Sequence, residues 1–336
     1  MMRSDLKAAL LLTLLATVPF LNKPVHIDDT FVLRVSNRIL ENPLDPFGGT
    51  IDWFGHELTV WEATTNPPFL SYVLSPAVWI SNSSEVVLHL MMVPFFLLLV
   101  LGMMSLLRRF YRPDWIPLLF LVTGPAVLVS GNLMRDLPGL GLVTSGVAWF
   151  VEGVDRRSWR RCLAGSVLIG LAALTKYSLG IVFGMMWVYC LLKRRYDQLA
   201  WVLVPVGMMA GWCLHTWLMY GQIHPVYLLL ERSGDSGLVA QDKYLMALSI
   251  LGCCLLLGPV MLVVGTLRKR WISVIGSLLF GLYSVRMSGL FYGDPEDYEL
   301  FLWVFLGSIT LLFAVAAAFG DLDKTDSAFL VVWVLS

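Results

Sequence analysis

Charged residues are scarce in this chain of 336 residues. They make up 14% of it, whereas about a quarter is usual for a soluble domain. Hydrophobic residues reach 57%, and the mean hydropathy is +0.74. Because so little charge cannot cover the surface of a soluble protein of this size, the composition predicts a chain embedded in lipid. The formal net charge is zero, which gives no indication of a nucleic-acid partner.

Several chemical signatures are missing as well. The five cysteines lie in apolar runs without metal-type spacing to any histidine, so we interpret them as small residues of the membrane core. No glycine-rich phosphate-binding motif of the dinucleotide or P-loop type occurs, so a nucleotide cofactor is not indicated. The sequence has no convincing repeat, low-complexity segment or separate soluble domain. We therefore predict a single transmembrane domain over residues 1–336.

Apolar runs recur along the whole chain. Because a membrane-spanning helix needs about 20 apolar residues, they predict an all-α polytopic membrane protein with about 10–11 transmembrane helices. The first run lacks a small-x-small cleavage site, so we expect a retained helix and not a signal peptide. The candidate spans are 6–21, 86–107, 115–131, 139–154, 162–175, 179–192, 199–220, 244–267, 272–289 and 300–319.

A last apolar run begins at residue 327, and as a helix it would be only about half as long as a bilayer requires. We expect a C-terminal truncation with at least one further span missing. A short terminal helix packed against the bundle is the alternative.

Short basic clusters predict the orientation. With the N-terminus in the cytoplasm, the sequences RRFYR, DRRSWRR, KRRYD and RKRW all fall in inside loops, in agreement with the positive-inside rule. The compact loops suit a bacterial inner membrane, and the endoplasmic reticulum membrane is the eukaryotic counterpart.

A long first extracytoplasmic loop, residues 22–84, dominates the outer side. Asp28 and Asp29 open it, and apolar residues at 31, 32, 35, 39 and 40 predict an amphipathic helix lying on the membrane surface. Its dipole favours acids at this end, so N-capping is one explanation for the pair. Adjacent side chains point in different directions, so at most one of the two acids is expected to face a shared pocket.

Two further polar pairs are expected at the outer ends of spans. Arg135 and Asp136 lie in GNLMRDLPGLG, and Lys176 and Tyr177 lie in GLAALTKYSLG. A surface turn is the alternative role of the first pair, and a lysine reaching the membrane interface is the alternative for Lys176. Ionisable residues near membrane depth favour a functional interpretation.

The order of these features resembles that in the membrane glycosyltransferases of the GT-C superfamily. The acidic pair is followed by NPPFLSYVL (66–74), by RDLPGL and by GLAALTKY, so that the resemblance covers roughly residues 5–220. The chain is similar to the polyprenyl- or dolichyl-phosphate-mannose protein mannosyltransferases and the aminoarabinose transferases of glycosyltransferase family 39. The resemblance implies transfer of a hexose from a polyprenyl-phosphate or dolichyl-phosphate donor to a hydroxyl acceptor at the extracytoplasmic face. The acceptor is a protein, lipid or glycan, which indicates protein glycosylation or cell-envelope synthesis.

The resemblance also implies residue roles. Asp28 matches the family's catalytic acid and would act as general base, and Asp136 matches the acid after the third span. The substrate-binding candidates are Asp29, Arg135, Lys176, Tyr177 and Asn66.

The sequence departs from the family pattern at three positions. Asn66 replaces the usual histidine of the HPPL stretch, Ser71 a frequent lysine, and Asp29 a common glutamate. These departures shift the phosphate-binding role towards Lys176 or Arg135.

No cofactor is firmly indicated, and a divalent metal ion stays open, with His26, Asp28 and Asp136 as candidate ligands. A packed or exposed loop histidine is the alternative for His26.

Two other function classes are alternatives. A lipid or sugar transporter or flippase would place charges deep inside spans, whereas the charges here gather at loop mouths. A non-catalytic scaffold with the GT-C fold would need no base, and both Asp28 and Asp136 are present.

Overall fold

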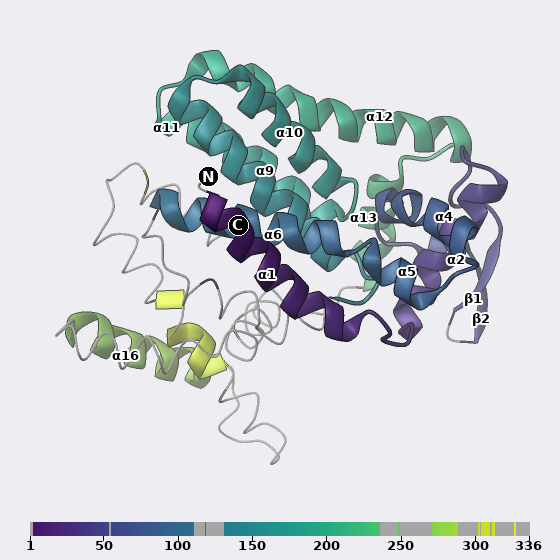
Figure 1. Ribbon diagram of the computed structural model, residues 1–336, viewed down its shortest axis with the longest axis horizontal. Coiled ribbons are helices and arrows are strands. Elements are labelled where there is room, and N and C mark those ends of the chain that lie inside the picture. The colour runs from purple at the N-terminus through teal and green to yellow at the C-terminus, as the bar shows by residue number, and fades with distance from the viewer. Residues whose placement is uncertain are drawn as a thin grey trace. The chain divides into compact units, whose positions relative to one another are not determined.

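The computed structural model describes residues 3–53, 55–110, 118, 131–235, 248, 271–287, 302, 304–309, 311–312 and 326. The chain divides into two compact units. The first comprises residues 1–123 and 127–231, and the second residues 124–126 and 232–336 (Figure 1).

The first unit is predominantly helical. Its helices in chain order are α1 (Arg3–Thr17), η1 (Val18–Phe20), α2 (Ile27–Glu41), α3 (Val60–Ala63), α4 (Phe69–Ser81), α5 (Glu85–Leu90), α6 (Val93–Phe110), α9 (Asp136–Arg156), α10 (Trp159–Ala173), η2 (Tyr177–Ile181), α11 (Val182–Leu192), η3 (Tyr196–Val202), α12 (Leu203–Tyr220) and α13 (His224–Asp235), the last of which continues into the second unit. In the described part of the second unit, α16 (Trp271–Met287) packs through Val274 against Ile309 and Phe305.

Three of the described helices are long and apolar enough to cross a membrane. They run over 85–110 (α5 and α6), 136–156 (α9) and 196–220 (η3 and α12), so the runs predicted at 86–107, 139–154 and 199–220 lie in candidate spans by length and composition. Shorter apolar helices cover most of the runs at 6–21, 179–192 and 272–289, and α10 covers the run at 162–175. The spans predicted at 115–131, 244–267 and 300–319, and the last run from 327, lie largely or wholly outside the described residues.

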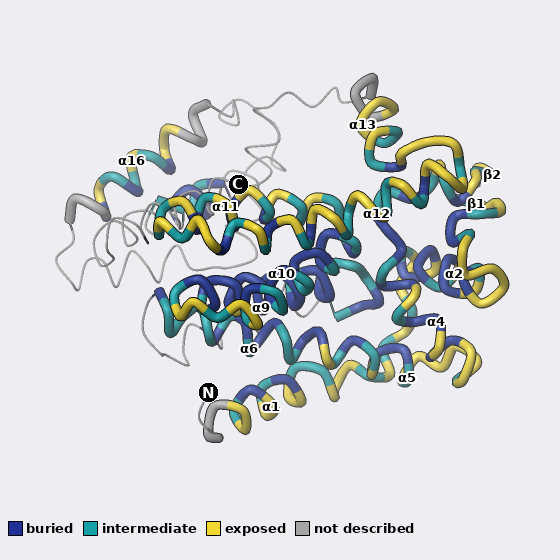
Figure 2. Tube along the Cα trace, turned by 90° about the horizontal axis from the view of Figure 1, so that it is seen from above, coloured by how far each residue is buried: buried dark blue, intermediate teal, exposed yellow. Residues whose placement is uncertain are grey.

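The helix α9 forms the centre of the first unit, and it is dark along most of its length in Figure 2. Glycines let its neighbours approach closely. A Cβ atom on Gly165 of α10 would lie 2.6 Å from the carbonyl oxygen of Gly146 in α9. On the other side, a Cβ atom on Gly102 of α6 would lie 2.5 Å from the backbone nitrogen of Ser145. The backbones of these three helices therefore pack with no space for a side chain at the crossing points.

The predicted helix at the start of the outer loop is α2, but its apolar face packs on protein and not on lipid. Phe31, Val35 and Ile39 are buried in one cluster with Phe47 and Val60, whereas Leu40 is 41% exposed. This burial corrects the expectation of a helix lying on the membrane surface. The apolar side of α2 packs against α4 and against the strands described next.

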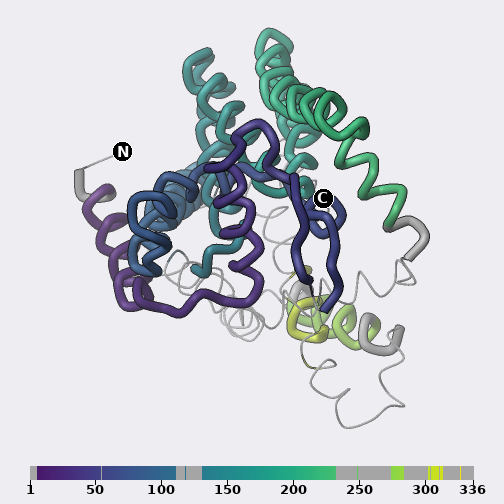
Figure 3. Tube along the Cα trace, turned by 90° about the vertical axis from the view of Figure 1, so that its right-hand side faces the viewer, coloured from purple at the N-terminus to yellow at the C-terminus, as the bar shows by residue number. Residues whose placement is uncertain are grey.

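The fold class also needs a correction, because the outer loop contains an antiparallel hairpin as well as helices. Strands β1 (Thr50–Trp53) and β2 (His56–Thr59) pair with Trp53 opposite His56. Gly55 directly precedes β2, and its φ of 80° suits glycine. Phe31 of α2 meets Trp53 edge to face with ring centroids 5.3 Å apart, which fixes the hairpin beside α2 (Figure 3).

Candidate functional site

The acidic pair Asp28–Asp29 lies in the first turn of α2, where its two members have different environments. His26 is the N-cap and its Nδ1 accepts from the backbone N–H of Asp28 at 3.3 Å. Asp29 completes a capping box, because its Oδ2 accepts from the backbone N–H of His26 at 2.9 Å. Asp29 is therefore a buried structural residue, and burial raises its pKa.

Asp28 instead faces a cavity of about 290 Å³. Its side chain is 44% exposed and its Oδ2 lies 3.7 Å from Nδ1 of His26. The expectation that at most one of the two acids faces a pocket is thus confirmed. The residues around the cavity come from α2, the hairpin, the loop before α4 and the turns before α9 and η2, and they are Asp28, Phe31, Val32, Trp53, Ala63, Thr64, Thr65, Asn66, Met134, Arg135, Asp136 and Lys176.

Arg135, at the N-cap position of α9, forms no ion pair with any of the described carboxylates. Its Nε and Nη2 are buried without a hydrogen-bond partner among the described residues. Its Cζ lies 5.7 Å from the centre of the Phe31 ring, which holds the guanidinium against α2. Burial lowers its pKa to about 10, so it remains protonated at neutral pH. A buried guanidinium with unused donors at a cavity wall can bind an anion.

Lys176, by contrast, already has an anion. Its Nζ lies 2.6 Å from Oδ1 of Asp136, and both side chains are a little over one-third exposed. The pair joins the turn after α10 to the first residue of α9. Lys176 and Asp136 therefore present a nearly neutral unit to the cavity, next to the guanidinium of Arg135.

The NPPF segment reaches the same place from the outer loop. The backbone N–H of Phe69 donates to the carbonyl oxygen of Leu174 at 3.3 Å, which docks the start of α4 on the end of α10. Asn66 lines the cavity, and its amide donates to Oγ1 of Thr65 at 2.9 Å. Ser71 is buried, and its Oγ donates to the carbonyl oxygen of Val32 in α2 at 3.1 Å. A lysine at position 71 would not fit between these two helices, which is a physical reason for that departure from the family pattern.

Tyr177 does not line the cavity. Its hydroxyl accepts from Nε1 of Trp212 at 2.7 Å and lies 2.8 Å from Nδ1 of His224. His224 is buried beside Trp61, with ring centroids 4.6 Å apart, and burial lowers its pKa to about 4. Tyr177 thus joins η2 to α12 and to His224, which in turn packs on Trp61 of the outer loop. The structure does not place Tyr177 at the cavity, where its predicted substrate-binding role would need it.

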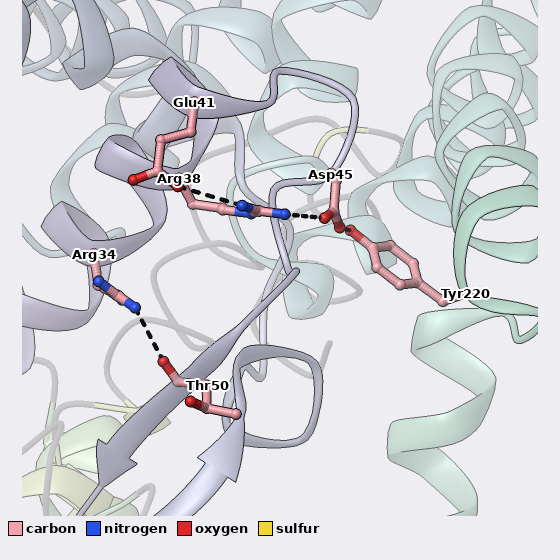
Figure 4. Close-up of polar contacts among 6 residues, drawn as sticks. All are labelled: Arg34, Arg38, Glu41, Asp45, Thr50 and Tyr220. Atoms are coloured by element: carbon pink, nitrogen blue, oxygen red, sulfur yellow. Dashed lines mark hydrogen bonds and ion pairs between the residues drawn. The ribbon is translucent and has the colours of Figure 1, made fainter.

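A second anchor of the outer loop is Asp45, which lies between α2 and α12 (Figure 4). It accepts from Nη2 of Arg38 in α2 and from the hydroxyl of Tyr220 in α12 at 2.8 Å. The same hydroxyl accepts from the backbone N–H of Phe47 at 3.0 Å. The outer loop that carries Asp28 is therefore attached to the bundle at Asp45 and Phe47 as well as at Phe69.

The metal-ligand candidates do not form a cluster. Within the described residues, no group of three or more His, Cys, Asp or Glu side chains is arranged to hold a metal ion. Nδ1 of His26 and Oδ2 of Asp28 lie 3.7 Å apart, but Asp136 does not join them in such a group.

Sequence reasoning missed several residues of the site. Thr64, Thr65, Trp53 and Met134 line the cavity, and no motif marks them. The alternating TIDW and HELT segments around Gly55 could have predicted the hairpin that carries Trp53.

Comparisons with known proteins show the fold. No protein-family model and no curated protein matches this sequence. Among solved structures, the Archaeoglobus fulgidus oligosaccharyltransferase tethered to an acceptor peptide with the NVT sequon is similar, with a TM-score of 0.52 and 12% identity over 99% of this chain and 53% of that chain. The archaeal oligosaccharyltransferase AglB from Archaeoglobus fulgidus, in complex with an inhibitory peptide and a dolichol-phosphate, has a TM-score of 0.49 and 16% identity over 98% of this chain and 49% of that chain.

The chain therefore spans about half the length of the structures it matches. At this identity the likeness concerns the fold alone. Together with the apolar helices, it supports an integral membrane protein. The chain therefore shares its fold with the part of the Archaeoglobus fulgidus oligosaccharyltransferase that it covers.

Proposed function

We propose that this protein transfers a sugar from a polyprenyl-phosphate or dolichyl-phosphate donor to a hydroxyl acceptor at the extracytoplasmic face of the membrane. The observation that carries the proposal is the buried guanidinium of Arg135 at the wall of a cavity that also contains Asp28. Its Nε and Nη2 have no hydrogen-bond partner in the part of the chain that the structure describes. A lipid-linked phosphate is the anion that a membrane protein with the GT-C fold would bind next to Arg135. The sequence resemblance to glycosyltransferase family 39 agrees with this donor class.

In this proposal Arg135 binds the donor phosphate. Glycosyl transfer breaks the bond between the anomeric carbon and the phosphate oxygen, and the leaving phosphate keeps the electron pair. Its negative charge grows in the transition state, so a fixed cation stabilises it. Because Lys176 is paired with Asp136 at 2.6 Å, Arg135 is the better candidate for this role.

Asp28 is the proposed general base. The acceptor hydroxyl must lose its proton as its oxygen forms the new bond to the anomeric carbon, and a carboxylate within hydrogen-bond reach can take that proton. Asp28 faces the cavity and its side chain is 44% exposed, so it can meet a hydroxyl. Asp136, held by Lys176, would orient the acceptor, and Asn66 would contribute an amide.

The test is a transfer assay with the full-length chain in membranes and radiolabelled polyprenyl-phosphate sugars. We expect Asp28→Asn to lower the transfer rate by about 100-fold or more, since a positioned general base contributes on the order of 10²–10⁴. Asp52→Asn is the matched control, because Asp52 is an exposed acid of the same loop outside the cavity. It should transfer at the wild-type rate.

Two results would contradict the proposal. Equal rates for wild type and Asp28→Asn would remove Asp28 from the mechanism. If the folded wild-type protein transferred no sugar from any polyprenyl-phosphate or polyprenyl-pyrophosphate donor, the proposed activity itself would be wrong, and lipid transport would be measured next.

A further inference from the structure

A second cavity lies at the other end of α9 from Arg135. Because α9 has 21 residues, its two ends are about 30 Å apart, which is close to the thickness of a bilayer's hydrocarbon core. This cavity has a volume of about 730 Å³ and lies among α6, α9 and the start of α10. The positive-inside rule assigns this end of the bundle to the cytoplasmic side. Its described lining residues include none of the candidate site.

The inner part of the cavity is an apolar channel beside the contact between α6 and α9. Its lining includes Leu98, Leu101 and Met104 of α6 and Ala148 and Trp149 of α9. From Leu98 to Met104 the helix rises by about 9 Å, and Arg109 in the basic mouth of the cavity lies about 8 Å further along. The channel and its mouth together therefore span about the depth of one leaflet's hydrocarbon, half of roughly 30 Å.

The outer part of the same cavity is strongly basic. Its described lining residues include arginines at 108, 109, 156, 160 and 161 and carboxylates at 152 and 155. Asp155 is 2.6 Å from Nε of Arg109, and Glu152 is shared by two arginines, at 2.5 Å from Arg161 and 3.1 Å from Arg156. Within the described part of the chain, Arg160 faces no carboxylate and instead lies over the ring of Trp159 at 5.5 Å. Because one carboxylate serves both Arg156 and Arg161, the described residues around Arg156 and Arg160 carry an excess of positive charge.

We propose that this cavity binds an anionic phospholipid of the cytoplasmic leaflet. The phosphate of the headgroup would lie against Arg156 and Arg160, and one acyl chain would fill the apolar channel towards Leu98. A basic mouth joined to an apolar channel, together about one leaflet deep, matches both parts of such a lipid, whereas a free phosphate would leave the channel empty. Cytoplasmic leaflets are rich in anionic lipid, and each nearby arginine strengthens its binding. The inference does not depend on the proposed transferase activity.

Native mass spectrometry of the full-length protein, released from nanodiscs of phosphatidylglycerol and phosphatidylcholine in equal amounts, tests the proposal. We expect the wild type to retain phosphatidylglycerol preferentially. The double variant Arg156→Gln/Arg160→Gln should bind it roughly 10- to 30-fold more weakly, at about five-fold for each arginine. Glu152 keeps Arg161 as partner in this variant, so the fold should be maintained.

The matched control is Arg194→Gln/Arg195→Gln. It removes the same charge from a loop on the same predicted side, and neither residue lines the cavity. The control should retain phosphatidylglycerol like the wild type. Equal retention of the two lipids by the wild type, or equal losses in the two double variants, would overturn the proposal.

A second measurement needs no variant. Phosphatidylglycerol with a photoreactive group near the end of its acyl chain should crosslink to peptides that contain 98–104 or 145–151, which line the inner channel. Leu214, Trp217 and Leu218 are exposed on α12. Crosslinks confined to this face would show nonspecific contact with bulk lipid and would contradict a lipid site in the cavity.

Discussion

Lys176 and Asp136, which are 40 positions apart in the chain, form a 2.6 Å ion pair that joins the turn after α10 to the start of α9. The pair lies in the wall of the cavity that also contains Arg135 and Asp28. Since Lys176 neutralises Asp136, the guanidinium of Arg135 is left as the group that can attract a phosphate.

Breaking this ion pair should affect activity more than stability. Both side chains are more than one-third exposed, so Lys176→Gln should change the free energy of unfolding by only about 0–1 kcal/mol. The transfer rate should fall by about 10- to 100-fold because Asp136 loses its position, and Lys176→Arg should restore part of it. Lys23→Gln, which removes another lysine of the predicted outer side, is the control. An unchanged rate in Lys176→Gln would indicate a lysine that merely reaches the membrane interface.

Tyr177→Phe should affect stability more than activity. The change leaves Nε1 of Trp212 and Nδ1 of His224 without the hydroxyl that they contact at 2.7 and 2.8 Å. Each unpaired buried group costs about 1–3 kcal/mol, so thermal unfolding should occur at lower temperature while the KM for the donor stays the same. Tyr196→Phe, at a residue that is 64% exposed, should change neither. A raised KM in Tyr177→Phe with unchanged stability would restore the substrate-binding role predicted for Tyr177.

His224 should make the protein sensitive to acid. Burial lowers its pKa to about 4, below the roughly 6.5 of an unfolded histidine. The unfolded state therefore takes up the proton first, so this stability is complete above about pH 6.5 and is lost as the pH falls towards 4, by on the order of 3 kcal/mol. Unfolding midpoints of wild type and His224→Gln between pH 7.5 and 4.5 test this. The variant should lose less stability over that range, and parallel curves would contradict the assignment.

The close packing of α9 and α10 predicts unequal effects of two glycine substitutions. Gly165→Ala places a methyl group 2.6 Å from backbone atoms of Gly146 and Phe150, so the helices must separate and the unfolding free energy should fall by about 1–3 kcal/mol. Gly207→Ala in α12 meets nothing within 4 Å and should be neutral or stabilising by up to about 1 kcal/mol. Chemical denaturation in detergent compares the two, and equal midpoints would show that the helices are not so close.

Much of the helical framework could be predicted from the sequence, because helix length and apolar composition are local properties. The spans that became α9 and α12 and the amphipathic pattern of α2 are examples. The environment of α2 could not be predicted, since a face formed by Phe31, Val35 and Ile39 suits lipid and protein equally well. Only the fold shows that Phe47 and Val60 cover it.

The candidate site could be predicted in part, because the order of its motifs along the chain resembles a known pattern. Asp28, Asp136, Lys176, Arg135 and Asn66 line one cavity, as their order in the chain suggested. Asp29 and Tyr177 do not line it. Asp29 has the capping role that the sequence offered as an alternative for the acidic pair. The hydrogen bonds of Tyr177 join residues 35 and 47 positions apart in the chain, which no local pattern indicates.

The measurement that tests the central claim most directly is the affinity of the purified full-length protein for a polyprenyl phosphate, compared between wild type and Arg135→Gln. Arg34→Gln is the control, because Arg34 is an exposed arginine of α2 that donates to the carbonyl oxygen of Thr50 outside the cavity. We expect the Arg135 variant to bind at least ten-fold more weakly, since a charge-assisted hydrogen bond contributes about 1.5–3 kcal/mol, and the Arg34 variant to bind like the wild type. Equal affinity in all three proteins would show that Arg135 holds no lipid phosphate and would contradict this account of the site.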